Sequence, residues 1–318
     1  MLPETIGGAR SAPGPRPRAG RGGLDRLAGD RAMTKIFLLG VGCQKGGTTW
    51  LHEHLKAYPA VNMGFAKEYH VFDALTVPEC HGFRDAAVER VRALAAGPQI
   101  LAPEHEDSFR LLEFYRNPQR YFDYFQTLAL ADPRTRLTGD ITPSYAALSA
   151  ETLAGIRAGL EARGFAVRVV FLMRDPVERI ISAVRMMIKN DSRAAGGPGP
   201  GPEAELAEIL RYYPTPDCAI RSRYQDTIEN LDSVFDPESV HYLFYEDMFN
   251  TAVMRPFIES LGLDYRPGDF GDLVNVSRNS NPTPVAVRKT LHDHYAPTYA
   301  AVEQRFGPER IAGIWRRY

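Results

Sequence analysis

A short apolar run that ends in a glycine-rich turn is the feature that most constrains the fold of this chain. Four consecutive apolar residues, at 36–39, precede the segment Gly40–Leu51, which reads GVGCQKGGTTWL. An unbroken apolar run of this length is typical of a parallel strand buried on both faces. Glycines after it allow a tight turn, and the pattern from Thr48 to Ala57 is helical. The segment therefore predicts a strand, a turn and a helix in succession.

The rest of the chain repeats this alternation. Apolar runs at 167–173 and 240–245 predict two further buried strands, and weaker patterns at 60–63 and 135–140 predict two more. The run at 167–173 leads into Arg174-Asp175-Pro176, where aspartate suits a helix cap and proline suits the first helical turn. Strands that alternate with helices predict an α/β fold: a single P-loop-like domain whose central parallel sheet is flanked by helices on both faces.

Two segments have a composition that does not support packed structure. Residues 1–32 contain seven Gly, four Pro and six Arg, with hardly any large apolar residue. Burial cannot offset the entropy cost of ordering them, so we expect a disordered N-terminal extension followed by one domain at 33–318. The segment Ala194–Pro202 reads AAGGPGPGP and is expected to be a flexible, non-helical insert, either a lid or a surface loop.

Composition also limits the class of protein. The 38 Lys and Arg residues balance 39 Asp and Glu residues, which argues against a general nucleic-acid binder. Three cysteines are too few for a disulfide scaffold and fit a reducing compartment. No apolar run approaches the roughly 18–20 residues of a membrane span, or the apolar core of a secretory signal. We therefore expect a cytoplasmic enzyme without nucleic-acid partners or integral membrane association, and leave its oligomeric state open.

The glycine-rich turn has the chemistry of a phosphate cradle. Its backbone N–H groups and the start of the following helix attract an anion, Lys45 adds a full charge, and Thr48 and Thr49 add hydroxyl donors. The lysine precedes the Gly-Gly pair, whereas a Walker A motif requires Gly-Lys-Ser/Thr. This order weakens the case for a Mg²⁺-bound nucleoside triphosphate, although a P-loop kinase that acts on a small molecule remains the alternative.

Three motifs together resemble the sulfotransferases that use 3′-phosphoadenosine-5′-phosphosulfate (PAPS). Residues 44–51, QKGGTTWL, resemble the family's 5′-phosphosulfate loop. Residues 174–182, RDPVERIIS, resemble its 3′-phosphate motif, with Arg at a strand end and Ser eight residues later. Residues 67–72, KEYHVF, are similar to the Lys-Glu-x-His-Phe-Phe segment of the heparan-sulfate and related bacterial branches. The motifs stand in the family's order, and the resemblance runs from about Lys35 to the C-terminus.

The resemblance implies PAPS as co-substrate and a set of binding residues. PAPS is anionic at both ends, so two separated clusters are needed, and ligands of open α/β sheets gather at the carboxyl ends of the strands. The spacing of Tyr224 with Ile220 and Ile228 also fits a helix face in the core, so packing in the core is the alternative for this residue. The residues implied in binding are Lys45, Gly46, Gly47, Thr48, Thr49, Trp50, Arg174, Ser182, Tyr224 and Arg278.

The resemblance also implies how the reaction is catalysed. Glu68 would be the base that takes the acceptor proton, and Lys45 would stabilise the charge that develops during in-line transfer. His70 is the rival base, since an imidazole titrates near pH 6.5. The acceptor would be a hydroxyl or amine of a carbohydrate, a glycolipid or a small molecule. No metal is expected, because the pairs His52/His54 and His292/His294 are spaced two apart and point to different sides of a helix.

Overall fold

A computed structural model describes residues 34–97, 105–197, 201–268, 282–316 and 318 of the chain. From Thr34 onward, the described residues form one compact unit. The extension expected at 1–32 lies outside the described residues, as do positions 198–200 of the expected insert and the segment that contains Arg278.

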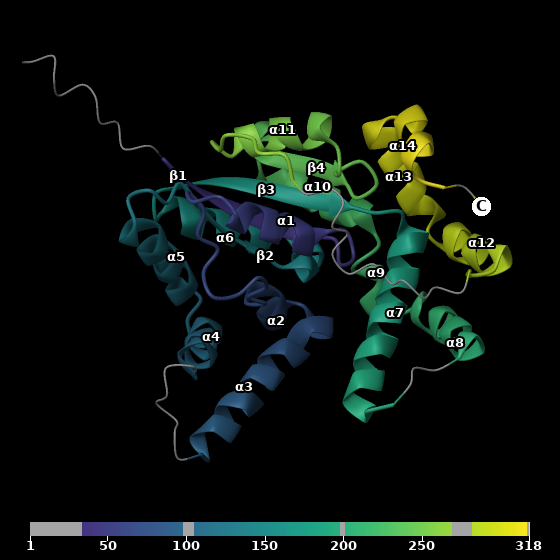
Figure 1. Ribbon diagram of the computed structural model, residues 1–318, viewed down its shortest axis with the longest axis horizontal. Helices are drawn as coiled ribbons and strands as arrows, with labels where there is room; N and C mark the ends of the chain where they lie inside the picture. The colour runs from purple at the N-terminus through teal and green to yellow at the C-terminus, as the bar shows by residue number, and fades with distance from the viewer. Residues whose placement is uncertain (1–33, 98–104, 198–200, 269–281, 317) are drawn as a thin grey trace, which may run out of the picture. The chain divides into compact units, whose positions relative to one another are not determined.

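The described residues contain one sheet of four parallel strands in the order β2-β1-β3-β4 (Figure 1). These strands are β1 (Lys35–Gly42), β2 (Leu137–Ile141), β3 (Phe165–Met173) and β4 (Val240–Phe244). The three strands expected from strong apolar runs are confirmed, and the weaker pattern near 135–140 is β2. In a parallel sheet all carboxyl ends lie at one edge, which brings together the residues that follow each strand.

The strand expected near 60–63 is wrong, because this segment makes only an isolated bridge from Val61 to Leu137. The carbonyl of Ala60 accepts from the N–H groups of Arg136 (2.8 Å) and Leu137 (3.1 Å), and Asn62 N–H donates to Leu137 O (3.0 Å). The chain then turns away, since the Asn62 side chain accepts from Gly64 N–H at 3.1 Å and Gly64 has φ 76°. The segment therefore covers part of the outer edge of β2 without extending the sheet.

Both faces of the sheet are covered by helices. Leu38 belongs to a cluster with Trp50 and Leu51 of α1 (Thr48–Lys56) and with Phe257 of α11 (Thr251–Ser260). The alternate β1 residues Phe37, Leu39 and Val41 belong to a second cluster on the other face. That cluster includes residues of α5 (Gln119–Ala131), α6 (Ala150–Glu161), α7 (Pro176–Ala195) and α10 (Tyr224–Val234). The unbroken apolar run of β1 is thus explained by burial on both sides.

The remaining helices lie around this core. In Figure 1, α3 and α4 lie below the sheet, and the two helices pack against each other. Besides α1, α5, α6, α7, α10 and α11, the described residues form α2 (Phe72–Thr76), η1 (Pro78–Cys80), α3 (His81–Ala95), α4 (Glu106–Arg116), η3 (Pro143–Ala147), α8 (Pro202–Tyr212), α9 (Pro216–Ala219), η4 (Pro237–Ser239), α12 (Val285–His294), α13 (Ala296–Phe306) and α14 (Pro308–Ile314).

Helix α7 begins as the sequence predicts and ends later. The Asp175 side chain caps it by accepting from Val177 N–H at 2.9 Å, and Pro176 occupies its first turn. The helix runs through Ala194 and Ala195, which were expected to be non-helical. It ends because Gly196, at φ 66°, takes the left-handed conformation that closes many helices. Alanine is the best helix former, which explains the two extra residues.

Candidate functional site

A cavity of about 270 Å³, here named the central cavity, lies at the carboxyl ends of β1, β3 and β4. It brings together residues from all three motifs, which lie at 44–51, 67–72 and 174–182 in the chain. Nine of the site residues predicted from the sequence line it: Lys45, Gly47, Thr48, Thr49, Trp50, Glu68, His70, Arg174 and Ser182.

Glycine is required at two positions of the turn before α1. Gly47 is the N-cap of α1 with φ 92°, and a Cβ there would lie 2.8 Å from Met248 Sδ. A Cβ on Gly46 would lie 2.8 Å from Cys43 Sγ and 2.9 Å from Leu172 O. Gly46 therefore faces inward and does not line the central cavity, and its N–H donates to Cys43 O at 3.0 Å. Its part in the site is to let the turn pack closely on β3.

Two cations stand in the central cavity without acidic partners. Neither Lys45 nor Arg174 makes an ion pair with any residue that the structure describes. Arg174 donates from Nη1 to Lys45 O at 3.0 Å and lies over the Tyr245 ring at 4.4 Å, while its buried Nε has no partner among the described residues. Burial and the charge of Arg174 lower the pKa of Lys45. A bound anion would relieve this concentration of positive charge.

Two basic residues of the central cavity also have left-handed backbone conformations. Lys45 has φ 69° and His70 has φ 50°, and they are the non-glycine residues with positive φ in the part of the chain described. Such conformations cost of order 1–3 kcal/mol and persist where the surrounding structure imposes them, most often at functional sites. Because both residues line the central cavity, their strained backbones indicate that this cavity is a functional site.

Tyr224 does not line the central cavity, although the sequence placed it near the nucleotide. Its side chain is 1% exposed, and its hydroxyl donates to Arg174 O at 2.7 Å. Tyr224 also packs edge to face on Phe171 of β3. Tyr224 therefore holds the backbone of Arg174 from the protein core. This position fits the alternative that Tyr224 is a core-packing residue. Arg278, which the resemblance also implies in binding, lies outside the described residues.

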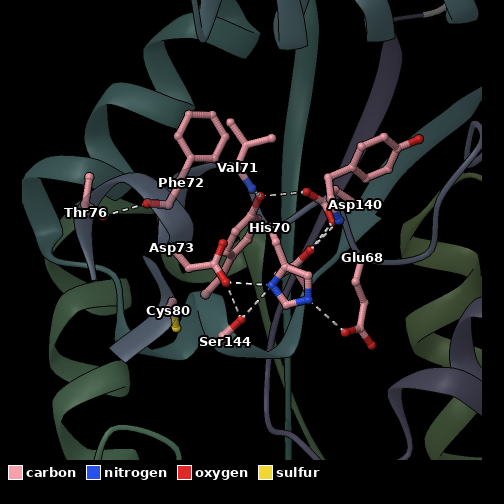
Figure 2. Close-up of polar contacts among 12 residues, drawn as sticks. Glu68, His70, Val71, Phe72, Asp73, Thr76, Cys80, Asp140 and Ser144 are labelled. Atoms are coloured by element: carbon pink, nitrogen blue, oxygen red, sulfur yellow. Dashed lines mark hydrogen bonds and ion pairs between the residues drawn. The ribbon is translucent and has the colours of Figure 1, made fainter. Parts of the chain in front are cut away.

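Glu68, His70 and Asp73 form a chain of hydrogen bonds (Figure 2). His70 Nε2 lies 3.2 Å from Glu68 Oε2, and His70 Nδ1 lies 2.7 Å from Asp73 Oδ2. Ser144 Oγ donates to the same Asp73 oxygen, and Lys67 Nζ pairs with the other oxygen of Glu68. Asp73 is fully buried, so the imidazole lies between an internal carboxylate and one that faces the cavity.

This arrangement sets the protonation of both central groups. Burial acts against charge on His70, but the hydrogen bonds to Asp73 and Glu68 outweigh it and raise the pKa of His70 to about 9. Burial likewise opposes ionisation of Glu68, yet the hydrogen bond from His70 and the charge of Lys67 lower its pKa to about 2. At neutral pH His70 is therefore an imidazolium, which cannot accept a proton, whereas Glu68 is ionised and can.

Hydrogen bonds on both sides of Glu68 hold its segment against the end of β2 and against Thr142, the residue that follows it. The carbonyl of Lys67 accepts from Ile141 N–H at 3.3 Å, and Tyr69 N–H donates to Thr142 Oγ1 at 3.0 Å. Thr142 in turn donates to the carboxylate of Asp140 at 2.6 Å. Asp140 is fully buried, where burial raises its pKa to about 6, and it does not line the cavity. It supports the segment that carries Glu68.

Several lining residues were not identified from the sequence. Tyr245 directly follows β4, so the rule that ligands gather at strand ends could have identified it. Arg221 lies three residues before Tyr224, and only the tertiary packing of the chain brings its side chain to the central cavity. Phe83 has no sequence signal at all, because its role depends on α3 packing beside His70. The complete set of missed residues is Gln44, Phe83, Pro143, Ser144, Met186, Arg221, Tyr245 and Phe249.

Within the described ranges, no three His, Cys, Asp or Glu side chains cluster in a way that could hold a metal ion. Nor does any helix in the part of the chain that the structure describes combine the length and apolar character needed to cross a bilayer.

One solved structure shares the fold, and two further sulfotransferase structures are similar to the chain at lower TM-scores. A sulfotransferase from Alicyclobacillus acidocaldarius is 20% identical, with a TM-score of 0.52 over 85% of this chain and 95% of that chain. The sulfotransferase domain of the Synechococcus PCC 7002 olefin synthase is 16% identical, with a TM-score of 0.41 over 82% and 94%. Sulfotransferase STF9 from Mycobacterium avium is 15% identical, with a TM-score of 0.42 over 83% and 77%. No curated protein matches the chain.

The family model extends this similarity of fold to the sequence. The model of the Sulfotransferase family matches residues 37–267, which include every residue found to line the central cavity. The match covers well over half of the chain, and it contains the glycine-rich turn, the segment of Glu68 and the strand end at Arg174. The chain therefore belongs to the sulfotransferase family.

Proposed function

We propose that this protein transfers the sulfuryl group from PAPS to a hydroxyl or amine of an acceptor. The observation that carries the proposal is the pair of cations, Lys45 and Arg174, which share one cavity and lack acidic partners among the described residues. They follow two adjacent parallel strands, β1 and β3. A donor with an anionic group at each end of an adenosine would neutralise both cations at once.

The two ends of the donor would have different partners. The 5′-phosphosulfate would bind at the start of α1, near Lys45 and the hydroxyls of Thr48 and Thr49. No side chain caps this helix, so its first N–H groups can receive an anion. The 3′-phosphate would bind Arg174, whose planar guanidinium suits phosphate oxygens, together with Ser182 on α7.

The reaction would proceed by in-line transfer in the central cavity, which both Lys45 and Glu68 line. The acceptor oxygen forms a new bond to sulfur as the bond from sulfur to the 5′-phosphate oxygen breaks. Glu68 takes the acceptor proton, Lys45 stabilises the charge on the leaving phosphate, and 3′,5′-adenosine bisphosphate departs. Both oxygens of Glu68 are engaged, by Lys67 and His70. Acceptor binding would displace one of these donors and so raise the basicity of the carboxylate.

His70 then has a positioning role. Its imidazolium holds Glu68 on one side and is itself held by Asp73 on the other.

The family resemblance allows a carbohydrate, a glycolipid or a small molecule as the acceptor, and each of these can present a nucleophilic hydroxyl to Glu68.

Nucleotide protection distinguishes this function from the P-loop kinase alternative. We expect 3′,5′-adenosine bisphosphate to raise the unfolding temperature without Mg²⁺. At a hundred times its dissociation constant it would add about 2.7 kcal/mol to the free energy of unfolding, which amounts to several degrees. Stabilisation by Mg-ATP alone would instead support the kinase.

The identity of the base is tested by two variants. Glu68→Gln keeps the shape of the side chain but removes the proton acceptor, so turnover should fall by about 10²–10⁴-fold while 3′,5′-adenosine bisphosphate still binds. His70→Asn should be the milder change, because it removes a positioning contact. Steady-state rates and calorimetric nucleotide binding measure both effects. An active Glu68→Gln beside an inactive His70→Asn would give the role of base to the histidine.

A further inference from the structure

A second cavity, of about 510 Å³, adjoins the central cavity. Glu68 and Phe83 line both, so the two spaces meet at the proposed base. The other lining residues come from the segment before Glu68 and from α3 and α4. We name this space the α3–α4 cavity. Its volume lies within the range that holds a compact organic molecule.

The lining of the α3–α4 cavity is mainly apolar. Six of the ten residues that line it have apolar side chains, and two of these, Ala86 and Ala87, are small residues on successive positions of α3 that leave room beside the helix. Polar atoms come from Arg90, Asp107 and Ser108, in addition to Glu68. The apolar members are Phe65, Ala66, Phe83, Ala86, Ala87 and Leu111.

Phe83 is the boundary between the two cavities. Its ring stacks on the imidazole of His70, with a centroid separation of 3.6 Å and an interplanar angle of 12°. The side chain nevertheless remains 39% exposed, which is unusual for a large aromatic residue beside a buried polar cluster. The exposed part of the ring offers an apolar wall directly next to the carboxylate that would take the acceptor proton.

From this juxtaposition we infer that the α3–α4 cavity holds the acceptor, and that the acceptor is a small alcohol or phenol with an aryl or alkyl body. Its hydroxyl would lie at Glu68 and its apolar body against Phe83, Ala87 and Leu111. A carbohydrate would place many of its hydroxyls against the six apolar side chains of the lining, which costs free energy for each hydroxyl left unpaired. The inference rests on the proposed function, since it names the substrate class of that same site.

A series of 4-alkylphenols tests the inference, from phenol to 4-butylphenol, with cellobiose as the carbohydrate. Each buried methylene contributes about 0.8 kcal/mol, so KM should fall roughly three- to fourfold per added carbon until the cavity is filled. Cellobiose should be a poor acceptor. Turnover is followed by release of 3′,5′-adenosine bisphosphate from PAPS, and binding of 4-butylphenol is measured separately by calorimetry.

Two tryptophan variants on α3 locate the effect. Ala87→Trp fills the α3–α4 cavity and should raise KM for 4-butylphenol at least about tenfold, remove the dependence on alkyl length and abolish calorimetric binding. Ala95→Trp, at an exposed position of the same helix outside the face that carries Ala86, Ala87 and Arg90, should behave as the unmodified protein. Both variants should bind 3′,5′-adenosine bisphosphate normally, because neither position lines the central cavity.

The outcomes separate the two proposals. Efficient turnover of cellobiose, or an unchanged alkyl-length dependence in Ala87→Trp, would overturn the acceptor inference while the sulfotransferase proposal stands. Failure of the unmodified protein to bind 3′,5′-adenosine bisphosphate would count against the proposed function. The calorimetric comparison of 4-butylphenol binding between the unmodified protein and Ala87→Trp would still decide whether the cavity takes an apolar phenol.

Discussion

Replacing Asp73 by asparagine should release His70 from its protonated state. Asp73 Oδ2 lies 2.7 Å from His70 Nδ1, and the Asp73 side chain is fully buried. Asparagine keeps the shape and can still accept a hydrogen bond, but it removes the charge that opposes the imidazolium. Loss of a close opposite charge changes a pKa by about 1–3 units, so the pKa of His70 should fall from about 9 toward its ordinary value.

The magnitude and sign of the effect on stability follow from this shift. A pKa of about 9 in the folded protein, against about 6.5 in the unfolded chain, corresponds to about 3 kcal/mol of stabilisation. Because the folded pKa is the higher one, this stabilisation is complete below about pH 6.5 and is lost as the pH rises through 9. Asp73→Asn should therefore be less stable than the unmodified protein by about 1–3 kcal/mol at pH 6, and the difference should shrink by pH 9.5.

Two measurements check this prediction. Proton NMR titration of the imidazole gives the pKa of His70, with His70→Gln used to assign its resonance. Urea unfolding at pH 6 and pH 9.5 gives the difference in free energy between the two proteins, and other groups that titrate in both proteins cancel in that difference. A pKa of His70 at or below 6.5 in the unmodified protein would refute the reasoning. Such a value would restore the histidine as a base at neutral pH.

The two phosphate sites proposed for PAPS give the remaining predictions. Lys45→Ala should lower kcat by at least about a hundredfold, because it removes the charge next to the breaking bond; steady-state kinetics with PAPS would show this, and a near-normal kcat would contradict the assignment. Arg174→Ala should instead weaken PAPS binding by about 10–150-fold, since it removes a charge-assisted contact of roughly 1.5–3 kcal/mol remote from sulfur. Equal PAPS affinity in a folded Arg174→Ala protein would make Arg174 a structural residue.

The sequence predicted those parts of the fold and site that have local causes. The apolar run of β1 reports burial on both faces, and Asp175 with Pro176 marks the start of α7 through cap chemistry that depends on neighbouring residues alone. The grouping of Lys45 and Arg174 was also predictable, because the carboxyl ends of parallel strands meet at one edge whatever the length of chain between them.

Features that depend on side-chain direction or tertiary packing could not be predicted. The motif includes Gly46 among the binding residues, yet this residue faces Cys43 and Leu172 in the interior. The resemblance also includes Tyr224 among the binding residues, but its hydroxyl donates to Arg174 O and it does not line the cavity, a position that its spacing with Ile220 and Ile228 had allowed. The partnership of His70 with Asp73 and the stacking of Phe83 arise only when α2 and α3 fold beside the strand ends.

The covering of β2 by the segment that starts at Ala60 links activity to solubility. An uncovered sheet edge offers unpaired backbone groups to another chain and promotes aggregation. Here the N–H groups of Arg136 and Leu137 are taken by Ala60 O, and the same segment continues directly to Glu68. Substitutions that loosen this segment would displace the proposed base and uncover the edge in one step. In a collection of variants, poor solubility and poor turnover should therefore fall on the same residues between 60 and 68.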